Sequence, residues 1–201
     1  MRLFNLGANM GDYFKYYLLL GLISVCNLKT YSQSYTVSNF QKINEIHGNF
    51  NENLNVGDSF GVSIDNIGDI DGNGVNDLAV GAFNDDDGGN NRGAVYILFM
   101  DDNDQVISQT KISSTSGGFA GVLNDNDFFG GAVAFLGDMN ADGFVELAVG
   151  ADYDADGGYW SGAVWILSLN SDGTVQGHVK ISDTEGGFTG GIGSDTIFGT
   201  D

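Results

Sequence analysis

The sequence contains no proline, whereas glycine is abundant, with 32 residues among 201. The lack of proline excludes collagen-like segments and proline-rich linkers, so glycine, asparagine and aspartate must make the turns. There is a single cysteine, Cys26, which excludes an intrachain disulfide. The folded chain must therefore be stabilised by packing or by a bound metal.

Positive charge is also scarce, because 7 Lys and Arg residues stand against 27 Asp and Glu residues, giving a formal net charge of −20. An acidic surface repels nucleic acids and anionic membranes and attracts cations. We therefore expect no nucleic-acid partner, although acidity can also serve solubility or adaptation to salt. Hydrophobic residues make up 42% of the chain, which argues against wholesale disorder.

No apolar run is long enough to span a bilayer. The longest, residues 16–25, follows Lys15 and has the length of a signal-peptide core, at about ten residues. We predict a signal peptide over residues 1–34, with Met10 as an alternative start, and hence a secreted or cell-surface protein without a transmembrane segment. A lipidated Cys26 or a buried first element are the alternatives.

The rest of the chain repeats at a constant spacing, which is that between Phe60 and Phe129. The markers that recur at this spacing are Phe60, Phe129 and Phe198, each followed by glycine; Lys42, Lys111 and Lys180; Phe50, Phe119 and Phe188; and the Gly-Ala pairs at 93 and 162. A fixed period of this kind indicates repeated structural units.

Each repeat contains four short strand-like runs, predicted at about 60–66, 77–82, 93–99 and 105–112, and at about 129–136, 146–151, 162–169 and 174–182. The third run of each repeat is apolar on both faces, which is typical of a strand covered on both sides. We predict an all-β fold of four-stranded antiparallel sheets that pack as β-propeller blades. A solenoid is the alternative.

The first repeat has oxygen ligands at positions 1, 3, 5, 7 and 9 of a loop: the side chains of Asp69, Asp71, Asn73 and Asp77 and the carbonyl of Val75. Short carboxylates and amides around a glycine turn suit Ca²⁺. An EF-hand would need glutamate at position 12, where this chain has Val80 inside a strand-like run. We therefore predict a calcium loop between two strands.

The combination of Phe60-Gly61, this loop and Leu78-Ala-Val-Gly-Ala82 resembles the FG-GAP repeat family, which includes integrin alpha-chain propellers and many secreted bacterial proteins. The resemblance covers residues 40–201 and implies a seven-bladed propeller with calcium in hairpin loops. It implies a second calcium ligand set: Asp138, Asn140, Asp142, the carbonyl of Phe144, and Glu146. The usual proline of the motif is replaced by Phe83 and Asp152, and Glu146 replaces the usual aspartate.

The repeat boundaries predict the domain organisation. Residues 35–59 close a preceding or ring-closing blade, residues 60–128 and 129–197 are two FG-GAP repeats, and residues 198–201 open a third. About two blades plus partial ones are expected. Because propellers need about four to eight blades, we interpret the chain as a fragment whose other blades lie elsewhere in a longer protein.

Two further acidic loops, residues 84–91 and 152–160, are expected to be exposed, and each is a weaker candidate for metal or ligand binding. Trp160, in the second of them, is a candidate ligand contact. Catalysis finds little support, since the two histidines, His47 and His178, are far apart in the sequence and neither recurs at the repeat spacing. No hydrolase or zinc-protease motif occurs either.

We therefore expect a non-enzymatic, calcium-binding adhesion or ligand-binding module whose partner is a protein or a glycan. The alternative is a non-catalytic propeller module of a larger secreted enzyme.

Overall fold

The structure is a computed structural model that describes residues 36–37 and 40–200. The predicted signal peptide lies outside the described residues. The chain divides into two units, residues 1–40 and 41–201, and every strand among the described residues belongs to the second. Among the described residues, no helix has the length and apolarity needed to cross a membrane.

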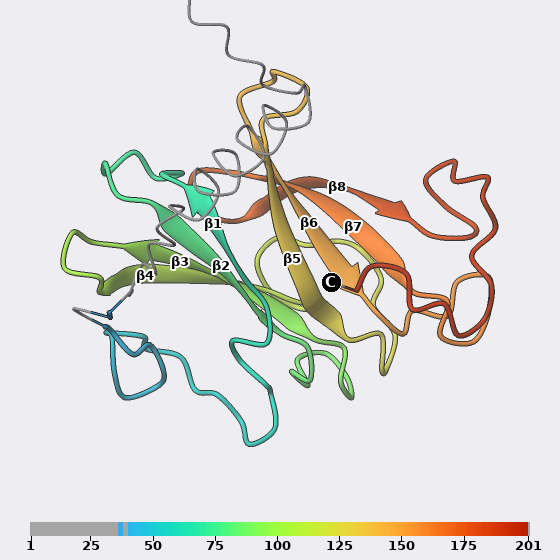
Figure 1. Cartoon of the computed structure of the whole chain (residues 1–201), viewed down its shortest axis with the longest axis horizontal. Coiled ribbons are helices and arrows are strands. Elements are labelled where there is room, and N and C mark those ends of the chain that lie inside the picture. The colour runs from blue at the N-terminus through green and yellow to red at the C-terminus, as the bar shows by residue number, and fades with distance from the viewer. Residues whose placement is uncertain (1–35, 38–39, 201) are drawn as a thin grey trace, which may run out of the picture. The chain divides into compact units, whose positions relative to one another are not determined.

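The second unit holds eight β-strands in two four-stranded antiparallel sheets, which confirms the all-β prediction (Figure 1). Each sheet has its strands in chain order. The first sheet, blade 1, consists of β1 (Ile64–Gly68), β2 (Asp77–Ala82), β3 (Ala94–Met100) and β4 (Val106–Ile112). The second, blade 2, consists of β5 (Phe129–Gly137), β6 (Val145–Ala151), β7 (Ala163–Leu169) and β8 (Val175–Ile181).

The predicted strands are present with boundaries shifted by a few residues, the largest shift being at the start of β1. Phe129 pairs with Ala151 in β6 and bridges Gly93 of blade 1, so β5 begins there. The equivalent Phe60 has no such bridge among the described residues, and β1 begins only at Ile64. In blade 2 the strand thus starts at the Phe-Gly motif that is bridged to the neighbouring blade.

A continuous hydrophobic core lies between the two blades. The odd-numbered residues of β3 (Val95, Ile97 and Phe99) pack with blade 2 residues that include Leu147, Val149 and Leu167. The even-numbered residues of β3 pack into a second cluster on the other side of blade 1. The double-sided burial predicted for this strand is confirmed, because all seven of its residues are buried.

Each blade also has a group of three packed aromatic residues at equivalent positions of the repeat. In blade 2, Phe119 stacks on Phe129 with ring centroids 5.3 Å apart and meets the edge of Trp165 at 5.1 Å. The equivalent trio of blade 1, one repeat earlier, is Phe50, Phe60 and Tyr96, with centroid distances of 4.9 to 5.6 Å. Phe50, Phe119 and Phe129 are thus core residues and Phe60 packs against the core, whereas the recurring Phe188 is 42% exposed.

Glycines let the two blades approach at backbone distance. Gly93 forms a parallel bridge with Phe129, and a Cβ atom on Gly93 would overlap the Phe129 carbonyl oxygen. A Cβ on Gly81 would likewise overlap the carbonyl oxygen of Gly130, which also accepts a hydrogen bond from Ser63 Oγ at 2.8 Å. The Phe-Gly of one repeat is therefore held by glycines of the preceding repeat.

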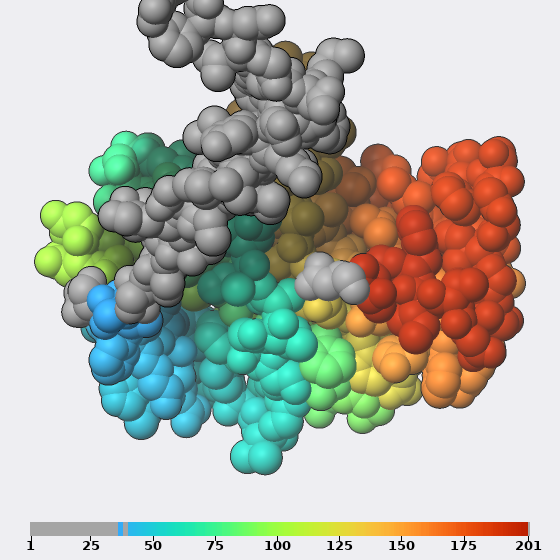
Figure 2. Space-filling view, in the orientation of Figure 1, coloured from blue at the N-terminus to red at the C-terminus, as the bar shows by residue number. Residues whose placement is uncertain are grey.

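The segment before blade 1, residues 41–60, covers the outer face of that blade. Phe50 is 1% exposed and packs with Tyr96, Leu98 and Met100. In Figure 2 this segment, in blue, lies directly beside the first blade. It contains an isolated bridge between Asn44 and His47 and no longer strand. It packs on blade 1 much as residues 111–128 pack on blade 2.

The strand order sorts the loops into two groups. In an antiparallel sheet ordered β1-β2-β3-β4, the β1–β2 and β3–β4 loops lie at one end of the strands, and the β2–β3 loop and the chain leaving β4 lie at the other. The same holds for blade 2. The predicted calcium loops therefore share one end, and the acidic loops 84–91 and 152–160 share the opposite end.

Candidate functional site

The β1–β2 loop brings three carboxylates together. Oxygen atoms of Asp69, Asp71 and Asp77 all lie within 4.8 Å of one another. Asp69 Oδ1 accepts hydrogen bonds from the backbone N–H groups of Gly72 and Asn73 at 2.8 and 3.0 Å, and its Oδ2 accepts one from Gly74 at 2.8 Å. These bonds fold the loop tightly around the carboxylates, as the glycine positions predicted.

Asp77 is the buried member of this group, whereas Asp69 and Asp71 are exposed. Its two carboxylate oxygens accept backbone N–H groups from Ile70 in the loop and Met100 at the end of β3, both at 3.0 Å, and these bonds fix its position. Burial, aided by the nearby Asp71 and Asp69, raises the pKa of Asp77 despite these hydrogen bonds. A cation among these carboxylates would offset both effects.

Asn73 and Val75 are the other two predicted ligand positions of this loop. Asn73 Oδ1 accepts the Val75 N–H at 2.7 Å, while its Nδ2 donates to Asp71 Oδ2 at 3.2 Å and to the Met100 carbonyl at 3.0 Å. The Val75 side chain packs against the outer core cluster of blade 1. The loop is therefore anchored at both ends to the sheet.

The β5–β6 loop of blade 2 repeats this arrangement with one change. Asp138 accepts backbone N–H groups from Asp142 and Gly143, and Asn140 Oδ1 accepts the Asp142 N–H at 2.9 Å. Asp142 in turn accepts the N–H of the half-buried Phe144 at 2.9 Å. The loop backbone thus follows the same hydrogen-bonding scheme as in blade 1.

Glu146 makes the difference between the two loops. It is buried, like Asp77, and accepts the Met139 N–H at 2.8 Å, but its longer side chain reaches the Ser168 hydroxyl at 3.0 Å rather than a β7 N–H. Within the described part of the chain, three carboxylates gather within 4.8 Å only in the first loop. The two loops therefore share a backbone but present different oxygen arrangements.

The donor set fits calcium better than other metals. All the side chains that converge in both loops offer oxygen, and no histidine or cysteine lies among them. Ca²⁺ takes six to eight oxygens at about 2.3–2.6 Å in flexible geometry, and carboxylates, amides and backbone carbonyls are its usual ligands. Bound there, it would supply positive charge to the clustered carboxylates.

The acidic loops at the opposite end are arranged differently from our expectation. They were expected to be exposed, which is wrong for Asp85 and Asp154, at 2% and 0% exposed. Asp85 pairs with Lys111 at 2.9 Å, and Asp154 pairs with Lys180 at 2.7 Å. The recurring lysines therefore neutralise recurring buried aspartates, because unpaired buried charges are costly.

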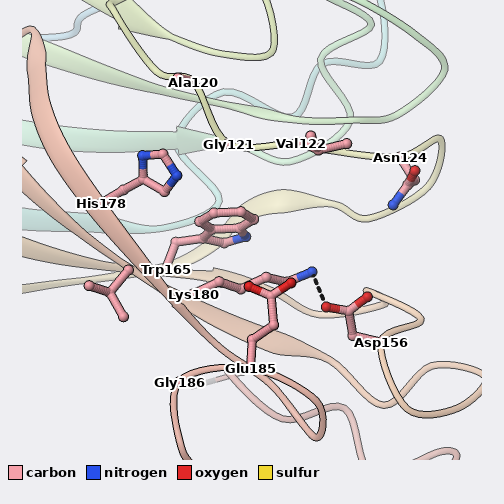
Figure 3. A pocket seen from close by; sticks show the side chains of 11 residues that line it. Ala120, Gly121, Val122, Asn124, Asp156, Trp165, His178, Lys180, Glu185 and Gly186 are labelled. Carbon is pink, nitrogen blue, oxygen red and sulfur yellow. Dashed lines mark hydrogen bonds and ion pairs between the residues drawn. The ribbon is translucent and has the colours of Figure 1, made fainter.

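A second carboxylate joins each of these pairs. Asp87 lies 3.4 Å from Lys111, and Asp156 lies 2.6 Å from Lys180. Figure 3 shows the Lys180–Asp156 pair at the wall of a cavity of about 530 Å³, with Trp165, His178 and Glu185 around it. Trp165 Nε1 is buried and has no hydrogen-bond partner among the described residues.

Asp127 belongs to the same buried group and supplies a pH-dependent prediction. It is 2% exposed, and burial, aided by Asp154 and Asp156 and opposed by Lys180, raises its pKa to about 6. Because the folded pKa exceeds the unfolded value, the free energy of unfolding falls as pH rises from about 4 to about 6 and then levels. In denaturant titrations, the stability of Asp127→Asn relative to wild type should increase over this range. A constant difference from pH 4 to pH 7 would contradict the assignment.

Trp160 lies at this end too, at 40% exposure, and its ring contacts Tyr153 and Tyr159 at 4.9 and 4.4 Å. Sequence reasoning singled out Trp160 but missed the other rings. The available signal was that Tyr159 and Trp160 depart from the repeat, since asparagines stand at the equivalent positions of the first copy.

Two comparisons with known proteins agree with this architecture. Residues 129–167 match the family model of the FG-GAP repeat. Integrin alpha-PS2 of Drosophila melanogaster is 35% identical over 117 residues, which are 56% of this chain and 8% of the integrin. The chain thus spans a small part of the length of that relative.

The matched segment runs from Phe129 through the β5–β6 loop and into β7, so the family match and the repeated blade geometry describe the same unit. Residues 129–167 of the chain therefore match an FG-GAP repeat.

Proposed function

We propose that this chain is a secreted or cell-surface propeller module that binds a ligand in adhesion and is stabilised by calcium. The observation that carries the calcium assignment is the convergence of Asp69, Asp71 and Asp77 within 4.8 Å. The recurrence of the loop in the second repeat supports a second site at Asp138, Asn140, Asp142, Phe144 and Glu146. The integrin relative supports an adhesion-type role.

Calcium acts in this proposal as a structural group. It is held by the side chains of Asp69, Asp71, Asn73 and Asp77 and the carbonyl of Val75. It thereby joins the β1–β2 loop to the first residue of β2. A ligand that binds only the folded state raises the free energy of unfolding, by about 2.7 kcal/mol at a concentration 100 times Kd. No residue of the loops is assigned a chemical step, and the module is proposed to be non-enzymatic.

The calcium proposal predicts a metal-dependent melting temperature. In differential scanning fluorimetry of the intact protein, millimolar calcium should raise the melting temperature above that in EGTA, and magnesium should raise it less. Asp71→Asn should lower the calcium-dependent rise by about half, because the blade 2 loop remains, and should reduce the calorimetric stoichiometry from two to one.

Asp104→Asn is the matched control for this variant. Asp104 is an exposed acid on the β3–β4 loop with φ +59°, a conformation that asparagine also adopts. The variant therefore removes the same charge and leaves the β1–β2 loop unchanged. It should keep the full calcium-dependent rise. Equal melting temperatures in calcium and EGTA for the wild-type protein would overturn the structural-calcium proposal.

A further inference from the structure

A second cavity, of about 550 Å³, opens at the end of blade 2 opposite the calcium loops. It lies between the chain entering β5 (Asn124–Phe128) and the β6–β7 loop, which contributes Tyr153, Tyr159 and Trp160. Its size is that of a small-molecule site. Aromatic rings make up its apolar lining, and amides and carboxylates of residues 124–127 form its polar side.

The rings form a continuous row. Phe83 contacts Phe128 at 5.5 Å between centroids, Phe128 contacts Tyr153 at 5.0 Å, and Tyr153 contacts Trp160 at 4.9 Å. Tyr159 then stacks on Trp160 at 4.4 Å with an interplanar angle of 23°. The row ends at the surface, because Tyr159 is 63% and Trp160 40% exposed. Two large stacked rings thus face solvent at the mouth of the cavity.

The fold itself does not need these two rings. In blade 1 the equivalent residues are Asn90 and Asn91, and they make the same backbone contacts. Asn126 N–H donates to the Asn90 carbonyl at 2.8 Å, as Asp195 N–H donates to the Tyr159 carbonyl at 2.9 Å. The loop backbone is therefore maintained equally well by asparagine.

Trp160 is also a conformationally unfavourable choice. Its φ is +52°, and Asn91 has φ +49° at the equivalent position. Asparagine adopts this left-handed region readily, whereas a bulky residue there is an outlier. An exposed, strained aromatic residue where asparagine suffices indicates a functional site.

We propose that this cavity binds a neutral sugar ring of a glycan, whose apolar C–H face packs on Tyr159 and Trp160. The negative face of an aromatic ring attracts the partially positive C–H groups of a pyranose. Sugar hydroxyls can donate to the oxygens of Asn124 and Asp125 on the polar side. The proposal rests on the ligand-binding function above and names its ligand class.

Charge decides between neutral and anionic glycans. The chain carries a net charge of −20, and Asp125 and Asp127 line the cavity. One cation, Arg92, pairs with Asp125 at 2.8 Å. Sialylated or sulfated sugars would be repelled by such a surface. A site of this size also suits one or two sugar rings better than an extended peptide, so we commit to a neutral glycan.

The test titrates the intact protein, in calcium, with neutral oligosaccharides of glucose, galactose, mannose and N-acetylglucosamine. Sialylated and sulfated oligosaccharides form the comparison set. The chain has two tryptophans, and Trp165 is only 3% exposed, so a change in tryptophan fluorescence reports mainly on Trp160. Isothermal titration calorimetry gives the Kd. We expect at least one neutral oligosaccharide to bind and to alter the fluorescence.

Three variants make the test specific. Trp160→Asn and Tyr159→Asn install the blade 1 residues, and each should weaken binding by at least tenfold. Trp160→Asn should melt no lower than wild type, because it relieves the left-handed tryptophan. Ile107→Asn removes a comparably exposed apolar side chain (53%) from β4, outside the cavity, and should leave the Kd unchanged.

Failure of every neutral oligosaccharide to bind, binding of anionic glycans only, or full affinity in Trp160→Asn would overturn the glycan site. Trp160-dependent binding of an unglycosylated peptide would also overturn it, in favour of a protein ligand. The calcium-dependent melting temperature is measured on the same samples. If the calcium shift persists without sugar binding, only the glycan inference fails; if sugar binds without a calcium shift, only the calcium role fails.

Discussion

Replacing Gly93 by alanine is expected to lower the free energy of unfolding by about 4 kcal/mol. A side chain in the left-handed conformation of this residue, with φ +85°, costs about 1–3 kcal/mol. Its Cβ would also overlap the backbone of Phe129, and forcing apart a well-packed contact costs about 1–3 kcal/mol more. The backbone of Phe129 cannot turn aside as a flexible side chain would.

The site of this clash makes the effect spread beyond one residue. Gly93 and Phe129 form the parallel bridge between blades 1 and 2, and the Phe129 N–H donates to the Arg92 carbonyl at 3.0 Å. Phe129 is itself fully buried in the core between the blades. Displacing its backbone should therefore loosen the interface between the two sheets, which hydrogen exchange of β5 amides can detect.

Gly61→Ala separates the two contributions. Gly61 has nearly the same conformation, φ +89°, but a Cβ there would meet nothing within 4 Å. This variant should lose only the conformational term, about 1–3 kcal/mol. Urea titration of both variants gives the comparison. If Gly61→Ala and Gly93→Ala are equally destabilised, the backbone contact between the blades contributes nothing and the interpretation is wrong.

The strands and the inward folding of the first acidic loop could be predicted because their signals are local. Val95 to Phe99 is apolar on both faces, and the sheet buries it on both faces as expected. The oxygen-bearing residues at 69, 71, 73 and 77 alternate along a glycine turn, and the loop folds them inward. The repeat spacing extended both predictions to blade 2, but there the alternate β7 residues Val164, Ile166 and Ser168 are only half-buried, so the two-sided burial expected for this strand is wrong.

The acidic loops could not be predicted because their state depends on a distant partner. Asp85 is buried where Lys111, on β4, reaches it across the sheet and the Tyr96 hydroxyl donates to it. The sequence shows that a lysine recurs in each repeat. It does not show that the ammonium group of this lysine contacts an aspartate of the β2–β3 loop. Sequence position alone therefore could not distinguish a buried ion pair from an exposed acidic loop.

The aromatic row is a different case, because the repeat itself contained the information. Comparison of the two copies shows Tyr159 and Trp160 where the first has Asn90 and Asn91. A difference between copies becomes informative only once the backbone of both is known to be the same. The structure shows this through matching φ values at Asn91 and Trp160.

Lys180→Met is expected to cost about 3–5 kcal/mol, because removing one partner of a buried ion pair leaves an uncompensated charge. The Lys180 side chain is 6% exposed and that of Asp154 is 1% exposed. Burial alone would lower the pKa of Lys180, but hydrogen bonds and charge from Asp154 and Asp156 outweigh it and raise the pKa. Methionine keeps an unbranched side chain that is one atom shorter, so the measured loss in urea titration reflects mainly the charge.

The double variant Asp154→Asn with Lys180→Met tests that reasoning. Removing both charges should recover part of the loss, giving a coupling energy of at least about 1 kcal/mol in a double-mutant cycle. Lys111→Met is the matched comparison in blade 1. Lys111 is more exposed, at 22%, and the Tyr96 hydroxyl also donates to Asp85 at 3.2 Å, so this variant should lose roughly half as much. Equal losses in the two blades, or a coupling energy near zero, would show that burial of the pair does not determine its contribution.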